Sequence, residues 1–309
     1  MTGTIFLTAV SANNLAPVRL MIDSLRTFGG ELADAPFWVF ASDPSTGSPV
    51  PAAPAQAGQR PEPVRALETG STRVLPLTAP DPVTTYTLGK KVTACARAEE
   101  LAPAGTRSLV WIDAAYLFCQ PPTLFALSAD CDAAFRPVHI RNVGLSPSEP
   151  LDAFWSGIYS ALGVDDVRTT VTSFVDGQLL RTYFNSHAFA INPALGLMRG
   201  WYEHFQLLVS NKSFQSVACT DESHQIFLFQ ALLSALVATS IDPARICFLP
   251  PTYNYPYHLQ NQIPENQRAA TLNELVCFTY EERDIHPTAL TGIQVHEPLR
   301  SWLEARVMA

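Results

Sequence analysis

Short apolar runs alternate with amphipathic stretches along the chain. Residues 4–10 (TIFLTAV) and 37–41 (FWVFA) are rich in apolar and β-branched side chains, which is typical of buried strands. Between them, residues 16–28 carry apolar side chains every three or four positions, and this helical spacing stops at Gly29. Strand, helix and strand in this order predict the opening of a mostly parallel α/β sheet.

The same alternation continues to the end of the chain. Residues 44–66 interrupt it with Pro, Ala, Gly and Ser, and we interpret them as a surface insertion because strands resume afterwards. We therefore expect one domain over residues 1–309, a Rossmann-like three-layer α/β/α sandwich, with a C-terminal strand and helix in 276–309. Further strands are predicted at 74–77, 109–112, 133–138, 188–191, 246–249 and 277–280, and further helices at 90–101, 151–162, 195–209, 221–238 and 298–307.

Composition narrows the class of protein. With 47% hydrophobic and 16% charged residues, the chain can bury a large core and is not expected to be disordered. The net charge of −8 argues against a nucleic-acid partner, which would require a basic face. The chain has neither a continuous apolar run of about 18 residues nor a basic start, so we expect no transmembrane segment, no signal peptide and a cytoplasmic location. The scattered cysteines, without a CxxC pair, are expected to be reduced and buried.

Residues 111–118 (WIDAAYLF) carry the first candidate for chemistry. The apolar strand at 109–112 ends at Asp113, which places a carboxylate at the sheet edge where α/β proteins bind ligands. A divalent cation that holds a diphosphate needs neighbouring oxygen ligands, but the residue two positions further on is Ala115. The spacing alone leaves open that Asp113 simply ends the strand.

This segment resembles the DxD strand of the GT-A nucleotide-sugar glycosyltransferases of the glycogenin and lipopolysaccharide galactosyltransferase type. In that family two aspartates hold manganese or magnesium against the sugar nucleotide, and Ala115 stands at the second of these positions. Residues 183–193 (YFNSHAFAINP) are similar to the family's FNSGVFVINP strand, whose turn contacts the donor sugar, with His187 in place of the glycine. The resemblance implies a GT-A fold and a nucleotide-sugar site made of Thr8, Ala9, Val10, Asn13, Lys90, Lys91, Asp113, Ala115, Asn185, Ser186 and His187. A solvated surface pair is the alternative for the two lysines.

The resemblance also assigns a catalytic pair and an acceptor side. Asp221 and Glu222 stand where the family carries acidic residues near the reacting sugar, and either would orient the acceptor hydroxyl or act as a base. Capping of the helix at 221–238 explains the same acids equally well. Tyr253, Asn254 and Tyr255 lie in a loop (PTYNYPY) that resembles the acceptor loop and offers stacking surfaces, with packing of the loop as the alternative.

Charge at the leaving group is the open question. The family's C-terminal metal-ligating histidine corresponds to His286, with His296 as a second candidate, although the lysine of the family's motif is missing and a surface histidine is the alternative. Asp113 with His286 would hold Mn²⁺ or Mg²⁺ weakly. Alternatively, Lys90, Lys91 and helix N-terminal amides would neutralise the diphosphate without a metal.

The function implied by the resemblance is transfer of a sugar from a nucleoside-diphosphate-sugar, with a UDP-linked donor expected, to a hydroxyl acceptor. A member of the family that binds nucleotide or sugar without transfer is the alternative, because Ala115 and the missing lysine both reduce the neutralising charge. Another α/β enzyme class with similar strands is a third interpretation. The sequence does not specify the donor sugar, the acceptor, the stereochemical outcome or the oligomeric state.

Overall fold

The computed structural model describes residues 3–11, 15–42 and 64–307 of the chain. Within these ranges a seven-stranded sheet has the order β10-β6-β9-β4-β1-β2-β3. Neighbouring strands are parallel except β9, which is antiparallel to both β4 and β6. The mostly parallel sheet predicted from the sequence is thus confirmed. Its strands are β1 (Thr4–Ser11), β2 (Phe37–Ser42), β3 (Thr72–Pro76), β4 (Ser108–Ile112), β6 (Ala133–Pro137), β9 (Phe184–Ile191) and β10 (Ile246–Phe248).

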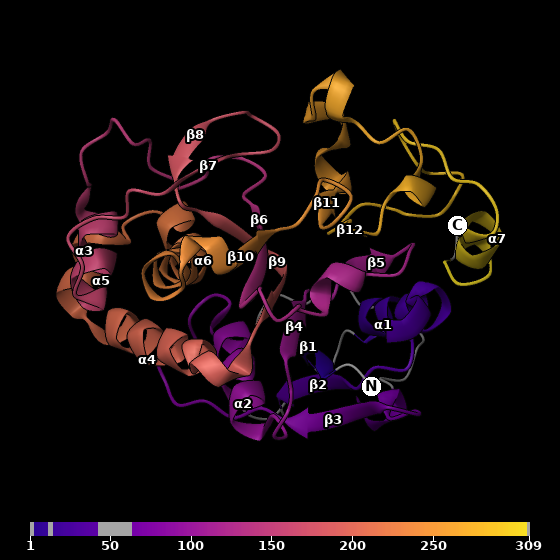
Figure 1. Ribbon diagram of the computed structural model, residues 1–309, viewed down its shortest axis with the longest axis horizontal. Coiled ribbons are helices and arrows are strands. Elements are labelled where there is room, and N and C mark those ends of the chain that lie inside the picture. Colours follow the sequence, from indigo (N-terminus) through magenta and orange to yellow (C-terminus); the bar gives the residue numbers. More distant parts are fainter. Residues whose placement is uncertain (1–2, 12–14, 43–63, 308–309) are drawn as a thin grey trace.

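Helices cover both faces of this sheet (Figure 1). On β4, Leu109 and Trp111 belong to one buried cluster and Val110 and Ile112 to the other, because successive side chains of a strand point to opposite faces. The first face packs against α2, α3, α4, α5 and α6, and the second against α1 and the C-terminal segment. The helices are α1 (Ala16–Phe28), α2 (Gly89–Leu101), α3 (Ala153–Leu162), α4 (Leu197–Ser210), α5 (Lys212–Ala218), α6 (Glu222–Ser240) and α7 (Leu299–Glu304).

Helix α6 is the one helix of the described part that is long and apolar enough to cross a membrane. It lies inside the protein, where 56% of its most apolar window is buried. The hydroxyl of Ser234 accepts a hydrogen bond of 2.8 Å from the backbone N–H of Phe184 on β9. This burial and this contact are those of a core helix.

The C-terminal segment forms its own small sheet beside α1 (Figure 1). Strand β12 (Cys277–Thr279) lies between β11 (Tyr255–Pro256) and β5 (Tyr116–Phe118). Helix α7 then packs on α1, and the Trp302 indole donates a hydrogen bond of 3.1 Å to Thr27. A separate hairpin, β7 (Thr170–Thr172) with β8 (Leu179–Arg181), lies beyond the end of β6.

The insertion expected at residues 44–66 lies outside the described residues up to position 63. Its last residues begin a short 3-10 helix, Val64–Leu67, which leads into β3. Leu67 of this turn is buried and belongs to the cluster on the α1 side of the sheet.

The expectation that all cysteines are reduced was wrong for one pair. Cys131 and Cys247 form a disulfide with a Cα–Cα distance of 5.9 Å and a sequence separation of 116 residues. Spacing along the chain could not reveal this pair, because the two residues meet only when β10 pairs with β6 at the sheet edge.

Candidate functional site

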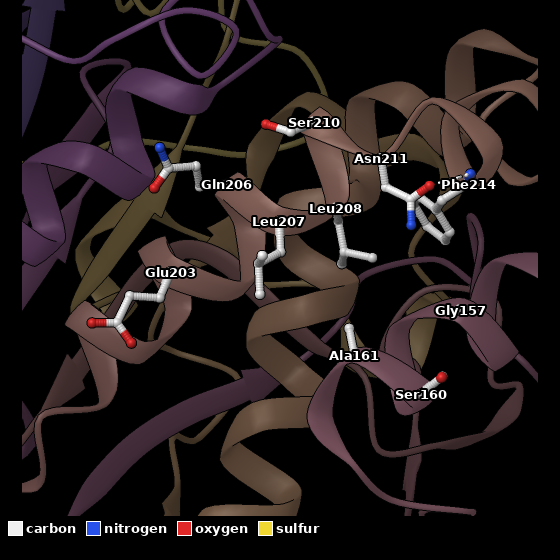
Figure 2. A pocket seen from close by; sticks show the side chains of 10 residues that line it. All are labelled: Gly157, Ser160, Ala161, Glu203, Gln206, Leu207, Leu208, Ser210, Asn211 and Phe214. Atoms are coloured by element: carbon white, nitrogen blue, oxygen red, sulfur yellow. Dashed lines mark hydrogen bonds between the residues drawn. The ribbon is translucent and has the colours of Figure 1, made fainter.

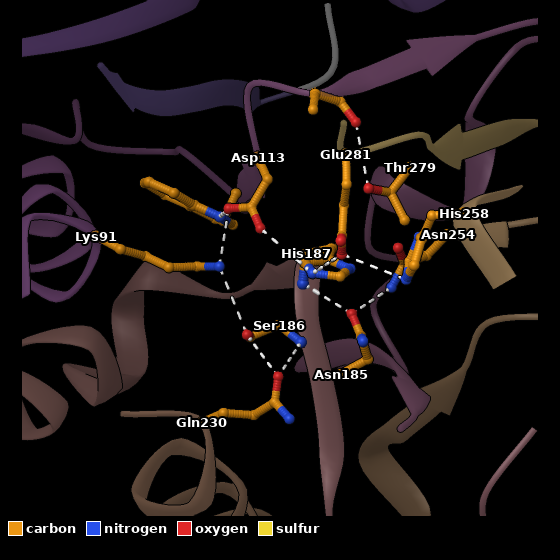
Figure 3. A network of polar contacts seen from close by, with 12 residues as sticks. Lys91, Asp113, Asn185, Ser186, His187, Gln230, Asn254, His258, Thr279 and Glu281 are labelled. Atoms are coloured by element: carbon orange, nitrogen blue, oxygen red, sulfur yellow. Dashed lines mark hydrogen bonds and ion pairs between the residues drawn. The ribbon is translucent and has the colours of Figure 1, made fainter. Parts of the chain in front are cut away.

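The two segments that the sequence analysis singled out lie side by side at one edge of the sheet. The parallel strands β1 and β4 end at this edge, and the antiparallel β9 begins there. The backbone N–H of Asp113, just past β4, donates a hydrogen bond of 2.8 Å to the carbonyl oxygen of His187 on β9. Asp113 and residues 185–187 therefore belong to one site (Figure 3).

Asp113 is held by a buried cation. The Lys91 ammonium lies 2.8 Å from Asp113 Oδ1, and the Lys91 side chain is only 4% exposed, against 28% for Asp113. The Trp111 indole N–H donates to the same oxygen at 2.7 Å. Lys91 also lies over the rings of Trp111 and Phe229, at 5.1 and 5.2 Å from their centroids. Pairing of this kind is what makes a buried ammonium tolerable, and it leaves the other oxygen of Asp113 turned towards His187.

A second set of contacts anchors β9 to helix α6. The Ser186 hydroxyl donates to Gln230 Oε1 at 2.8 Å, and the Ser186 backbone N–H donates to the same oxygen at 3.2 Å. Lys91 Nζ lies 3.5 Å from the Ser186 hydroxyl. The α6 layer therefore fixes the part of β9 that faces Lys91, and Figure 3 shows these groups converging.

Two histidines share one carboxylate on the other side of β9. The Nε2 atoms of His187 and His258 lie 3.5 and 3.3 Å from Glu281 Oε1, and His187 Nε2 lies 4.0 Å from Asp113 Oδ2. Burial lowers the pKa of His258 to about 4 and also lowers the pKa of His187. Both imidazoles are therefore neutral near pH 7. The ring of a third buried histidine, His139, lies 5.8 Å from that of His187 and 6.3 Å from that of His258.

Asn185 joins this pair of histidines to the aromatic loop. Its Oδ1 accepts hydrogen bonds from Asn254 Nδ2 at 2.7 Å and from the His187 backbone N–H at 2.8 Å. Asn254 and Glu281 both have a positive φ, 48° and 49°, a conformation that is uncommon outside glycine and is often found at functional sites. The aromatic loop therefore contributes to the site through the side chain of Asn254.

His258 and Glu281 were not predicted from the sequence. Glu281 comes within two residues of a predicted strand end, the same signal that identified Asp113, so it could have been named a candidate. His258 follows the aromatic loop at a position with no such signal, and only the folded chain places it beside Glu281.

The residues present do not fit the metal site that the resemblance implies. Among the described residues no three His, Cys, Asp or Glu side chains form a group that could hold a metal ion. Ala115 offers only its carbonyl oxygen, which already accepts hydrogen bonds from the Tyr280 N–H and the Thr279 hydroxyl at 3.1 and 3.2 Å. The half-buried His286 is bonded within its own loop, through its ring to Thr288. Position 115 therefore offers Asp113 no second carboxylate, and an ion held by Asp113 with His286 stays a prediction.

The remaining donor-site candidates lie at or beside the same edge. Thr8, Ala9 and Val10 are on the last half of β1, and Thr8 is fully buried with no hydrogen-bond partner for its hydroxyl among the described residues. Lys90 is half-buried in the first turn of α2, next to Lys91. Asn13 lies outside the described residues.

The acidic pair at 221–222 lies at the exposed N-terminus of α6. Asp221 is its N-cap residue, and its carboxylate accepts hydrogen bonds from the backbone N–H of His224 at 3.0 Å and from the ring of His224 at 2.6 Å. These contacts support the capping interpretation. A catalytic role for Asp221 or Glu222 stays a prediction.

The stacking role expected of the aromatic loop needs correction. Tyr253 and Tyr255 are 3% and 1% exposed, so neither ring has an open face. The Tyr253 hydroxyl accepts from the Leu124 N–H at 3.0 Å, and the Tyr255 hydroxyl lies 2.5 Å from Gln260 Oε1. Packing explains both tyrosines, because the loop crosses over the small C-terminal sheet.

A large surface hollow lies away from this edge. It has a volume of about 920 Å³ and is lined by α3, by α4 and by the start of α5 (Figure 2). Its lining includes Gly157, Leu207 and Phe214 but no residue of the Asp113 site. Size alone therefore does not identify the functional site of this protein.

Comparisons with known proteins agree with this architecture. The model of the Rhodobacterales glycosyltransferase domain family matches residues 14–240. Two structures of the galactosyltransferase LgtC, one with donor and acceptor sugar analogues and one of an active-site mutant, give TM-scores of 0.52 and 0.51 at 12% identity. Each match covers 99% of this chain and 96% of the other, whereas no curated protein matches. The chain belongs to the Rhodobacterales glycosyltransferase domain family and has a GT-A-type fold.

Proposed function

We propose that this protein transfers a sugar from a nucleoside-diphosphate-sugar to a hydroxyl-bearing acceptor. The observation that carries the proposal is the junction of Asp113 with residues 185–187 at the C-terminal edge of β4. Ligands of open α/β sheets bind at this edge, and the site gathers a carboxylate, an amide, a hydroxyl and imidazoles there. The family match supports the same reaction class.

A UDP-linked donor would lie across the ends of β1, β4 and β9. Thr8, Ala9 and Val10 would line the nucleoside, and Asn185, Ser186 and His187 would face the sugar and diphosphate. Lys91 is too deeply buried to contact much of a ligand. We assign it a positioning role, since it fixes the orientation of Asp113.

The proposal also has to account for the groups that neutralise the negative charge of the leaving diphosphate. A divalent ion such as Mn²⁺ or Mg²⁺ would supply positive charge at the leaving group, but Asp113 has no second ligand at Ala115 and already pairs with Lys91. We therefore propose that backbone N–H donors and the half-buried Lys90 supply most of the stabilisation, with weak or no dependence on metal. A protein that binds the donor without transferring sugar is the alternative, and the family match does not favour it.

Thermal unfolding with UDP tests the donor site directly. At a hundredfold excess over the dissociation constant, a ligand that binds only the folded state stabilises it by about 2.7 kcal/mol. We expect a shift with UDP that is nearly equal with manganese and with a chelator. Absence of any shift with nucleoside diphosphates would sink the proposal.

Two further measurements complete this test. Release of UDP from a panel of UDP-sugars, with and without added hydroxyl acceptors, separates a transferase from a protein that only binds. The variant Ala115→Asp restores the second carboxylate, so we expect manganese to increase its UDP-dependent shift. An unchanged metal effect in that variant would remove position 115 from the diphosphate site.

A further inference from the structure

A second hollow lies at the same edge of the sheet, beyond the C-terminal ends of β6 and β10. Its volume is about 480 Å³, within the range of about 300–1,000 Å³ that is usual for small-molecule sites. Its walls include Arg136, Phe174, Asp176, Phe248, Pro251 and Gln267.

The lining combines an exposed aromatic ring with polar groups at the rim. Phe248, the last residue of β10, is 56% exposed and is one of the most exposed large hydrophobic residues of the described chain. Pro251 continues the apolar wall, and Asp176 and Gln267 are exposed beside it. An apolar wall with a few placed polar groups is the usual composition of a small-molecule site. Sugar rings match it, because they present a C–H face to an aromatic ring and hydroxyls to carboxylates and amides.

Arg136 connects this cavity with the donor site. It is 3% exposed, and its guanidinium donates hydrogen bonds to the carbonyl oxygens of Tyr253 at 2.9 Å and Asn254 at 3.4 Å. Asn254 in turn bonds Asn185, and Arg136 pairs directly with Asn185 between β6 and β9. The cavity wall and the sugar-facing turn are therefore parts of one connected structure.

The sheet fixes the distance between Phe248 at the end of β10 and Asn185 at the start of β9. β10 is two strands away from β9 in the sheet, which corresponds to about 10 Å between their ends. A single sugar ring whose hydroxyl reacts beside Asn185 would not reach Phe248. A ligand that contacts both Phe248 and Asn185 is therefore longer than one sugar ring.

We propose that this cavity binds the part of the acceptor that lies beyond its reacting hydroxyl, and that the acceptor is a glycan of at least two sugar rings. Phe248 supplies the stacking surface, and Gln267 at the exposed rim faces the hydroxyls. The proposal rests on the proposed function for the position of the reacting hydroxyl. Binding of a glycan to the cavity is measurable without any transfer.

The experiment uses saturation-transfer NMR on the full chain with UDP present. The probes are disaccharides of glucose, galactose, mannose and N-acetylhexosamine, each compared with its own monosaccharides. We expect at least one disaccharide to bind at least tenfold more tightly than its monosaccharides. Phe248→Ala should weaken that disaccharide about tenfold while leaving the monosaccharides unchanged, since the loss of one stacked ring is an effect of this order.

Two further variants complete the design. Gln267→Ala, at an exposed rim position, should weaken the same disaccharide without affecting folding. Leu207→Ala removes an equally exposed apolar side chain, 62% exposed, from the hollow in Figure 2 and should have no effect.

The proposal fails if no disaccharide gives saturation transfer above its monosaccharides, or if Phe248→Ala and Leu207→Ala behave alike. The UDP-dependent thermal shift of the same samples separates this failure from that of the donor site. A normal UDP shift without glycan preference overturns only the acceptor cavity. Glycan binding without any UDP shift overturns the proposed transfer instead.

Discussion

At the scale of single residues, the contact that most shapes the site is the ion pair of Lys91 with Asp113. The ammonium is almost completely buried between two aromatic rings, so water cannot replace the carboxylate as its partner. Removing the Asp113 carboxylate leaves the Lys91 ammonium in a poorly solvated place, which costs more than the pair contributes. The pair therefore holds the Asp113 side chain in one orientation.

A double-mutant cycle measures this coupling. Lys91→Met, Asp113→Asn and the double variant should give a coupling energy of about 1–3 kcal/mol in urea unfolding, as for contacting residues of one network. The control is Arg97 with Glu100, an ion pair on the same helix whose side chains are 51% and 47% exposed. For that pair we expect less than about 0.5 kcal/mol. Equal coupling in the two cycles would contradict the role given to Lys91.

The sequence predicted about half of this site. Asp113 could be named because it follows an apolar strand, whereas Asn185, Ser186 and His187 could be named because their segment resembles a family motif. Glu281 and the histidines that face it come from loops far apart in the chain, so their meeting depends on tertiary packing. For Tyr253 the sequence left stacking and packing open, since a loop sequence does not show which surface the loop crosses.

At the scale of elements, the packing of α3 on α5 depends on one glycine. A Cβ at Gly157 would lie 2.4 Å from a ring carbon of Phe214 (Figure 2), far inside van der Waals contact. Gly200 on α4 has the opposite environment, because the nearest atom to its Cβ would be 3.9 Å away. Close packing therefore requires a glycine at position 157, whereas position 200 has room for a larger side chain.

Alanine substitutions at Gly157 and Gly200 should have opposite effects on stability. Gly157→Ala should destabilise the protein by about 1–3 kcal/mol through overpacking. Gly200→Ala should stabilise it by up to about 1 kcal/mol, because alanine is the better helix former. Urea unfolding checks both values, and a stabilised Gly157→Ala protein would show that α3 and α5 are not packed as described.

The N-terminus of α6 allows capping and catalysis to be separated. Asp221→Ala removes the acceptor for the His224 N–H and should cost about 1 kcal/mol of stability, whereas Asp221→Asn keeps a good cap and should lose only a few tenths. If Asp221 is the proposed base, transfer in the stable Asn variant falls by about a hundredfold or more. Unfolding midpoints and transfer rates of the two variants answer both questions. Equal destabilisation by Ala and Asn would exclude the cap.

The long elements could be read from the sequence because each is periodic within itself. Helix α1 matches its predicted range, and β1, β4 and α2 differ by one residue at an end. The short elements β5, β7, β8 and α5 were missed. Each is three to seven residues long, too short for periodicity, and the three strands exist because a partner strand is nearby.

At the scale of the whole molecule, the site lies between the helical layer and the C-terminal segment. Lys91 and Gln230 reach it from the helical layer, and His258 and Glu281 reach it from the C-terminal segment. Neither layer completes the site alone. Unfolding of the C-terminal segment would therefore remove the carboxylate and imidazole side of the site even with the central sheet intact.

This arrangement makes global stability depend on pH through His258. Burial lowers its pKa to about 4, below the ordinary value of about 6.5 that applies in the unfolded chain. The unfolded state therefore binds a proton first as pH falls. The stability that the neutral ring contributes is complete above about pH 6.5 and is lost progressively towards pH 4.

His258→Gln removes the titrating group while keeping a polar side chain opposite Glu281. Between pH 6.5 and 4, we expect its free energy of unfolding to fall less steeply than that of the wild type, by at most one proton per molecule. His296→Gln changes an exposed histidine of the C-terminal segment and should keep the wild-type slope. Urea unfolding at half-unit steps of pH gives the three slopes. If His258→Gln ran parallel to the wild type, His258 would titrate alike in the folded and unfolded chain, and its burial beside Glu281 would be wrong.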